Sequence, residues 1–78
     1  MEEKPDLDKL RGKLAEAHLS QADIARKLRM SPATLSNKMR GIYGFSVFEA
    51  GQIMKQCNEA KPGTFSGNDL IAIFFPWI

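Results

Sequence analysis

Polar and basic side chains that could bind an anionic ligand lie close together near the middle of this chain. Ser36 and Asn37 are followed directly by Lys38 and, two positions later, by Arg40. The asparagine amide can donate and accept at once, as the edge of an adenine base requires, and the two cations suit phosphate groups. The pattern therefore indicates a binding surface.

Catalytic chemistry has much weaker support. The 78 residues include one cysteine, Cys57, and one histidine, His18. The sequence has no glycine-rich phosphate loop and no spacing typical of metal ligands. We therefore expect no enzyme, no cofactor, no metal and no small-molecule ligand. A single cysteine also leaves no partner for a disulfide within the chain.

Two short helices are predicted to position the polar segment. Ser20 is a favourable N-cap for a helix over about 21–28, because its hydroxyl accepts a backbone N–H that has no helical partner. Ser31 caps the next helix, over 32–39, with Pro32 at the first helical position, where its missing N–H costs nothing. Each helix has one apolar stripe, formed by Ile24, Ala25 and Leu28 in the first and by Leu35 and Met39 in the second.

Residues 20–41 resemble the helix-turn-helix of the Cro and phage-repressor family. The positions that match in residue type and spacing are Gln21, Ala25, Ser31 and Leu35. The resemblance implies a lambda-repressor-like DNA-binding domain, an all-α compact five-helix bundle that occupies residues 1–78 as one domain. Its second motif helix, over 32–39, would enter the major groove. Arg29 replaces the glycine usual in the turn, and a left-handed conformation there would cost roughly 1 kcal/mol.

The resemblance also assigns roles to individual side chains. The residues expected to read bases are Pro32, Ala33, Ser36 and Asn37. Those expected to contact DNA phosphates are Gln21, Ser31, Lys38, Arg40, Tyr43 and Ser46. Asn37 is the strongest candidate for direct reading, because an amide pairs with adenine at two atoms. The serines are equally well explained as helix caps, so a second role for them stays open.

Charge supports this surface locally. The net charge is only +2, but the proposed motif contains five cations against one acid, Asp23. The cations are Arg26, Lys27, Arg29, Lys38 and Arg40. A basic patch on a nearly neutral protein favours phosphate contact, although an ordinary solvated face explains Arg26, Lys27 and Arg29 equally well.

Two longer helices are predicted to flank the motif. One begins at the cap Asp6 and runs to about Ala17. The other begins at Ser46, with Glu49 closing a capping box, and runs to about Asn58. Their buried sides are expected to contain Leu7, Leu10 and Leu14 in the first and Val47, Ala50, Ile53, Met54 and Cys57 in the second.

The C-terminal tail, residues 66–78, is predicted to form a short helix over about 69–75 that Ser66 or Asn68 caps, with a strand as the open alternative. Its expected core residues are Leu70, Ile71 and Phe74, and its expected interface residues are Phe75, Trp77 and Ile78. Contacts to one half-site are weak, so we expect a homodimer that spans half-sites about 34 Å apart.

The favoured interpretation is a sequence-specific transcriptional regulator that binds double-stranded operator DNA and occludes a promoter, as the resemblance implies. The alternative is an antirepressor or modulator that binds a phage repressor protein through the same fold and the apolar tail. A nucleoid or toxin–antitoxin regulator also stays open. The apolar run at 70–78 is too short to span a membrane and the acidic N-terminus is unlike a signal peptide, so a cytoplasmic protein is expected.

Overall fold

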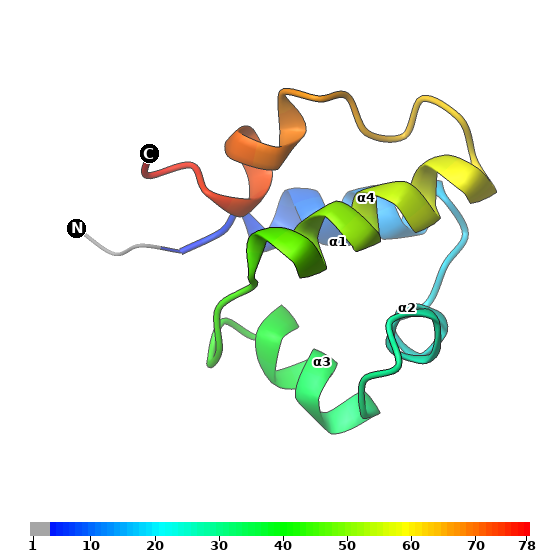
Figure 1. Ribbon diagram of the computed structural model, residues 1–78, viewed down its shortest axis with the longest axis vertical. Coiled ribbons are helices and arrows are strands. Elements are labelled where there is room, and N and C mark those ends of the chain that lie inside the picture. The colour runs from blue at the N-terminus through cyan, green and yellow to red at the C-terminus, as the bar shows by residue number, and fades with distance from the viewer. Residues whose placement is uncertain (1–3) are drawn as a thin grey trace.

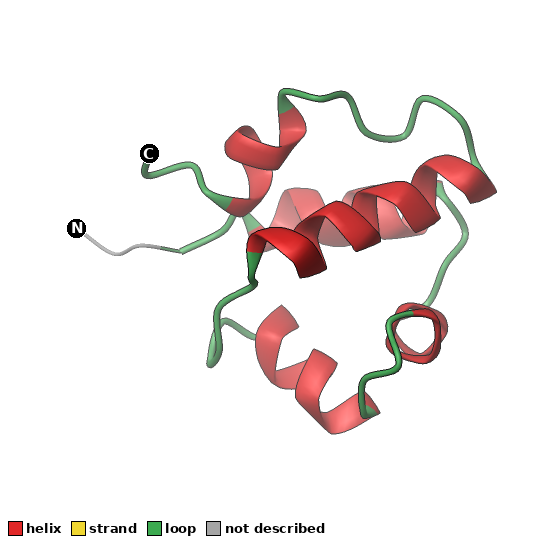
Figure 2. Ribbon diagram, viewed as in Figure 1, coloured by secondary structure: helices red, strands yellow, loops and turns green. Residues whose placement is uncertain are grey.

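The computed structural model describes residues 4–78, and all of its regular structure there is helical (Figure 2). The elements are α1 (Leu7–Glu16), α2 (Gln21–Lys27), α3 (Pro32–Met39), α4 (Val47–Ala60) and the short π-helix η1 (Leu70–Phe74). The prediction of an all-α protein with five helices is confirmed for this part of the chain. The alternative of a C-terminal strand is wrong, because that run forms η1.

The four α-helices begin where the sequence predicts. The N-caps are Asp6, Ser20, Ser31 and Ser46, and the side chain of each accepts a hydrogen bond from the backbone N–H three residues later. The predicted capping box of Ser46 and Glu49 is present, and Ser20 forms a second box with Asp23 that the sequence analysis did not identify. Local side-chain chemistry therefore fixes the start of each helix.

Three of these helices end in the same hydrogen-bonded motif. The backbone turns to positive φ at His18 (58°), Arg29 (56°) and Gly41 (83°), which follow α1, α2 and α3. After α2, for example, Arg29 N–H donates to Arg26 C=O at 3.2 Å and Met30 N–H donates to Ala25 C=O at 2.9 Å. This is the Schellman pattern, in which glycine is usual at the left-handed position. The expected left-handed conformation of Arg29 is confirmed.

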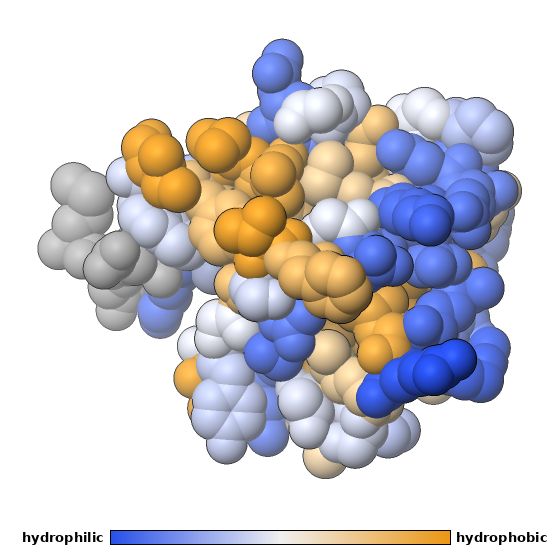
Figure 3. Space-filling view, viewed as in Figure 1, coloured by the Kyte–Doolittle hydropathy of each residue, from blue (hydrophilic) through white to orange (hydrophobic). Residues whose placement is uncertain are grey.

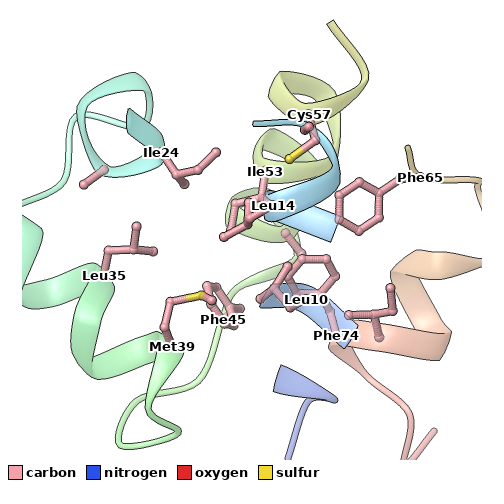
Figure 4. Packing of buried hydrophobic residues seen from close by; sticks show 14 residues of the cluster. Leu10, Leu14, Ile24, Leu35, Met39, Phe45, Ile53, Cys57, Phe65 and Phe74 are labelled. Carbon is pink, nitrogen blue, oxygen red and sulfur yellow. The ribbon is translucent and has the colours of Figure 1, made fainter. Parts of the chain in front are cut away.

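The core lies between α1 and α4, with α2 and α3 against one side and η1 against the other (Figures 1 and 4). Side chains from every helix enter it, including Leu10, Leu14, Ile24, Leu35, Met39, Ile53, Cys57 and Phe74. Two hydrogen bonds connect distant segments. Arg11 Nη2 donates to Met39 C=O at 2.7 Å, and Asp6 N–H donates to Ile73 C=O at 2.7 Å. The end of α3 and the C-terminal tail are thus both held to α1.

The tail differs from its predicted arrangement. Ile71 was expected in the core but is 45% exposed, whereas Ile73 is 1% exposed. Leu70, Ile73 and Phe74 are three and four residues apart and share one helix face, so Ile73 takes the core position that was assigned to Ile71. The predicted side-chain cap is also wrong, because η1 has none. Instead the Asp69 carboxylate accepts the backbone N–H of Ser66 at 2.9 Å.

The first turn of α4 also corrects an expectation. Val47 was predicted on the buried side, but it is exposed, as is its neighbour Phe48. Helical side chains tilt toward the N-terminus of their helix, so the side chain of the first residue projects past the helix end, where nothing in the described chain covers it. The other predicted residues of that side are buried or, in the case of Met54, half-buried.

Candidate nucleic-acid interface

The candidate interface lies on α3 and the segments at its two ends. α2 and α3 pack against each other, and in Figure 1 α2 is viewed nearly end-on while α3 runs across the picture. Ala25 of α2 and Leu35 of α3 are both fully buried. A small side chain at Ala25 lets the two helices approach closely, and the opposite side of α3 remains free for a ligand.

The predicted base-reading residues share this free side of α3. Pro32 and Ala33 are exposed, and Ser36 and Asn37 are half-buried. Their spacing of three and four residues places them on one helix face, which Arg40 extends. α3 contains no acidic residue, so this face would not repel a phosphate backbone.

The predicted phosphate-contacting residues flank that face, and most are exposed. Gln21, Arg40 and Tyr43 present exposed side chains. The hydroxyls of Ser31 and Ser46 already accept backbone N–H groups, at 3.1 Å from Thr34 and at 3.0 Å from Glu49. Both serines are therefore helix caps, and their contact with DNA stays a prediction.

Lys38 differs from the other predicted phosphate-contacting residues because it already has partners within the protein. Its Nζ lies 3.1 Å from Glu49 Oε1 and donates to Gly44 C=O at 2.8 Å. The same Nζ lies 6.0 Å from the centre of the Phe45 ring. The Lys38 side chain is only 14% exposed and that of Glu49 only 23%. From the sequence, Glu49 was predicted only as part of a capping box, because no local sequence pattern links it to Lys38, eleven positions earlier.

The acidic partner in this contact is stabilised in its ionised form. Burial acts to raise the pKa of Glu49, but hydrogen bonds from the backbone of Ser46 and from the Lys38 ammonium outweigh it and lower that pKa. At neutral pH the carboxylate and the ammonium are both charged. The contact is therefore a salt bridge that is largely shielded from solvent, where the attraction between the charges is stronger than in an exposed pair.

Three cations of the region remain available for a ligand. Arg26 pairs with Asp23 at 2.8 Å. The Ser20 backbone N–H and the Arg26 guanidinium lower the pKa of Asp23 to about 2. Lys27, Arg29 and Arg40 are exposed and form no ion pair with any residue of the described chain. Local positive charge therefore persists around α2 and α3.

A second notable surface is apolar. Orange atoms in Figure 3 cover the start of α4, η1 and the C-terminal segment. The large exposed side chains there are Val47, Phe48, Ile71 and Ile78, and we refer to these four as the apolar patch. Of the predicted interface residues, Ile78 is 79% exposed, whereas Phe75 and Trp77 are half-buried and in edge-to-face ring contact. Phe48, which is 73% exposed, was not among the predicted interface residues.

The remaining chemistry of residues 4–78 is limited. This part of the chain has no ligand-sized pocket and no group of three His, Cys, Asp or Glu side chains placed to hold a metal ion. Cys57 is buried in the core, and that burial raises the pKa of its thiol to about 11. No helix in the described residues is long and apolar enough to cross a membrane.

Comparison of the chain with protein-family models, with curated proteins and with solved structures gives no match. A function must therefore be argued from the residues and their geometry.

Proposed function

We propose that this protein is a sequence-specific DNA-binding regulator in which α2 and α3 form a helix-turn-helix and α3 enters the major groove. The observation that supports this best is the free face of α3. It combines hydrogen-bonding and small side chains with no acid, and exposed cations adjoin it. The Cro-type and lambda-repressor-like interpretation of residues 20–41 belongs to the same proposal.

On α3, Asn37 is the main base-reading residue in this proposal. Its amide can make two hydrogen bonds to adenine, which would discriminate against other bases by about 1–3 kcal/mol. Ser36 can donate to or accept from a base edge, whereas Pro32 and Ala33 offer only apolar contact, for example to a thymine methyl. Because α3 offers only two polar side chains for base contacts, Ser36 and Asn37, the specificity for each half-site would be modest.

Phosphate contacts would fix the position of α3 in the groove. Gln21 at the start of α2 and Arg40 at the end of α3 are both exposed. Tyr43 lies in the following loop, and the 14-residue helix α4 begins just beyond it. The first N–H groups of a helix favour an anion, so the Ser46 cap and the turn after it suit a phosphate.

Two copies of the chain would bind two half-sites of an operator and exclude other proteins from it. The interface would use Phe75, Trp77 and Ile78 together with the apolar patch. A specific observation supports a second candidate function: so much exposed apolar surface also suits an antirepressor that binds a phage repressor protein. Both functions would be performed in the cytoplasm.

The test is selection of binding sites from a library of random DNA duplexes with the purified chain. We expect enriched sequences that share a palindromic site, and loss of that enrichment in Asn37→Ala. Asn68→Ala is the matched control, because Asn68 is an exposed asparagine in the loop before η1, away from α3. Equal enrichment by Asn37→Ala would reject Asn37 as a reader, and no retention of DNA by the wild type would reject the proposal itself.

A further inference from the structure

One carboxylate oxygen organises the loop between α3 and α4. Glu49 Oε1 accepts the backbone N–H of Ser46 at 2.9 Å and lies 3.1 Å from Lys38 Nζ. The ammonium in turn donates to the carbonyl of Gly44 at 2.8 Å. The last turn of α3, the end of the loop and the first turn of α4 therefore meet at this pair. We call the pair Lys38–Glu49 the clamp.

The clamp holds the middle of the loop, between the hydrogen bonds at its start and the ring packing at its end. At the start of the loop, Gly41 and Ile42 N–H groups donate back to α3 at 3.1 and 2.9 Å. At its end, Phe45 is buried against Phe74, with ring centres 5.4 Å apart. Between these points only the Lys38 bond to Gly44 holds the backbone among the described residues. Tyr43, which is 55% exposed, lies between the two fixed ends.

We propose that Lys38 is a positioning residue and contacts no phosphate itself. Through Glu49 and Gly44 it sets the distance and angle between α3 and the phosphate-contacting segment that contains Tyr43 and the start of α4. This inference rests on the proposed DNA-binding function. Its chemical basis is that an ammonium with a carboxylate, a carbonyl and an aromatic ring as partners would lose all three by turning to a phosphate.

The experiment separates positioning from phosphate contact by salt dependence. Binding to a mixed-sequence duplex of about 20 base pairs is measured between about 50 and 200 mM salt. The slope of log K against log salt is negative, and each lost phosphate contact reduces its steepness by about 0.9. Arg40 is an exposed cation two residues after Lys38, so Arg40→Met is the matched comparison.

We expect Lys38→Met to weaken binding about three- to tenfold with an unchanged slope, whereas Arg40→Met makes the slope less steep by about 0.9. A slope that is less steep by about 0.9 in Lys38→Met would overturn the proposal.

A spectroscopic readout without DNA tests the clamp itself. Glu49→Gln removes the charge but keeps a side chain that can complete the capping box, so α4 should still begin at Ser46. In ¹H–¹⁵N spectra, Lys38→Met and Glu49→Gln should shift the amide signals of Gly44 and Phe45 alike, and the double variant should add little. Different or strictly additive shifts would reject the clamp.

Failure of the proposed DNA-binding function and failure of the clamp inference give different results. A wild type that binds no duplex while the amide shifts agree would reject the proposed function and leave the clamp as a feature of the loop. If Lys38→Met does not fold, Glu49→Gln still tests the inference. Binding by Glu49→Gln that matches the wild type, with unmoved loop signals, would overturn it.

Discussion

At the residue scale, two side chains occupy a backbone conformation that favours glycine. Arg29 and His18 each follow a helix in the left-handed region, which costs a residue with a Cβ about 1 kcal/mol. The cost at Arg29 falls in the turn between α2 and α3, beside the proposed DNA surface. The chain thus retains a cation at a position where glycine would be more stable.

Replacing Arg29 with glycine should separate stability from binding. We expect Arg29→Gly to raise the free energy of unfolding by about 0.5 kcal/mol, since relief of strain exceeds the added entropy of the unfolded chain. The same variant should bind DNA more weakly, with a salt slope reduced by up to about 0.9, because one cation is lost. Urea denaturation and duplex binding measure the two effects.

His18→Gly provides the control for this prediction. His18 has the same backbone conformation but follows α1, outside the proposed motif. It should gain similar stability with no loss of DNA binding. A loss of stability in both variants would show that the left-handed positions are not strained.

At the element scale, an ionised carboxylate stabilises the start of α4. The folded pKa of Glu49 lies below its ordinary value of 4.5, so the ionised form stabilises the folded state. That contribution is fully present above about pH 4.5 and disappears as the pH falls through the lower folded pKa. Asp23, whose pKa is about 2, acts in the same direction at a lower pH.

Glu49→Gln should therefore flatten the acid dependence of stability. We expect the urea midpoint of the wild type to fall more steeply than that of Glu49→Gln between about pH 5 and pH 3. Asp23 contributes equally in both proteins and does not affect the comparison. Identical pH profiles would mean that Glu49 has the same pKa in the folded and unfolded states.

Sequence patterns predicted the helices better than the contacts between them. Ser20, Ser31 and Ser46 mark helix starts because capping needs only the cap and the next three residues. The clamp between Lys38 and Glu49 joins two elements across a loop, so no local pattern contains it. The core assignment of Ile71 was wrong because the buried face of η1 is formed by Leu70, Ile73 and Phe74, at helical spacing that leaves Ile71 outside it.

In the candidate site, the helix positions of the side chains could be predicted from the sequence, but their partners could not. The outward position of Ala33, Asn37 and Arg40 follows from the helical spacing opposite Leu35 and Met39. Whether a cation there is free or engaged depends on the tertiary structure. Lys38 and Arg40 look equivalent in the sequence, yet one is held by Glu49 and the other is exposed.

At the scale of the whole molecule, the two notable surfaces are centred on different parts of the fold. In Figures 1 and 3, α2 and α3 lie at one end of the longest axis and the apolar surface lies toward η1 and the C-terminus. DNA on α3 would leave Ile71 and Ile78 of the apolar patch uncovered, whereas Val47 and Phe48 begin the helix whose first N–H groups are proposed to face a phosphate. Each copy could then contact DNA and a second copy at the same time.

If two copies pair through the apolar patch, as proposed, its size predicts a weak dimer. Four partly exposed side chains could bury on the order of 100 Å² each, or about 800 Å² over two copies, below the roughly 1,200–2,000 Å² of stable interfaces. The patch contains no charge, so a two-fold contact between identical patches would bring no like charges together. Association of the free chain would then be weak, and a palindromic site that holds two copies side by side would strengthen it.

Phe48→Ser tests this association. Phe48 is exposed, so the change should alter the stability of the folded chain little, while it removes the largest side chain of the patch. We expect sedimentation equilibrium to show weak self-association in the wild type and none in Phe48→Ser. Ile42→Ser, which removes an exposed apolar side chain outside the patch, should associate like the wild type.

On DNA, Phe48→Ser should bind single half-sites normally but lose the gain in affinity on a palindrome. A wild type that stays monomeric and binds one copy per palindrome would instead assign the apolar patch to a different protein, as the antirepressor function requires.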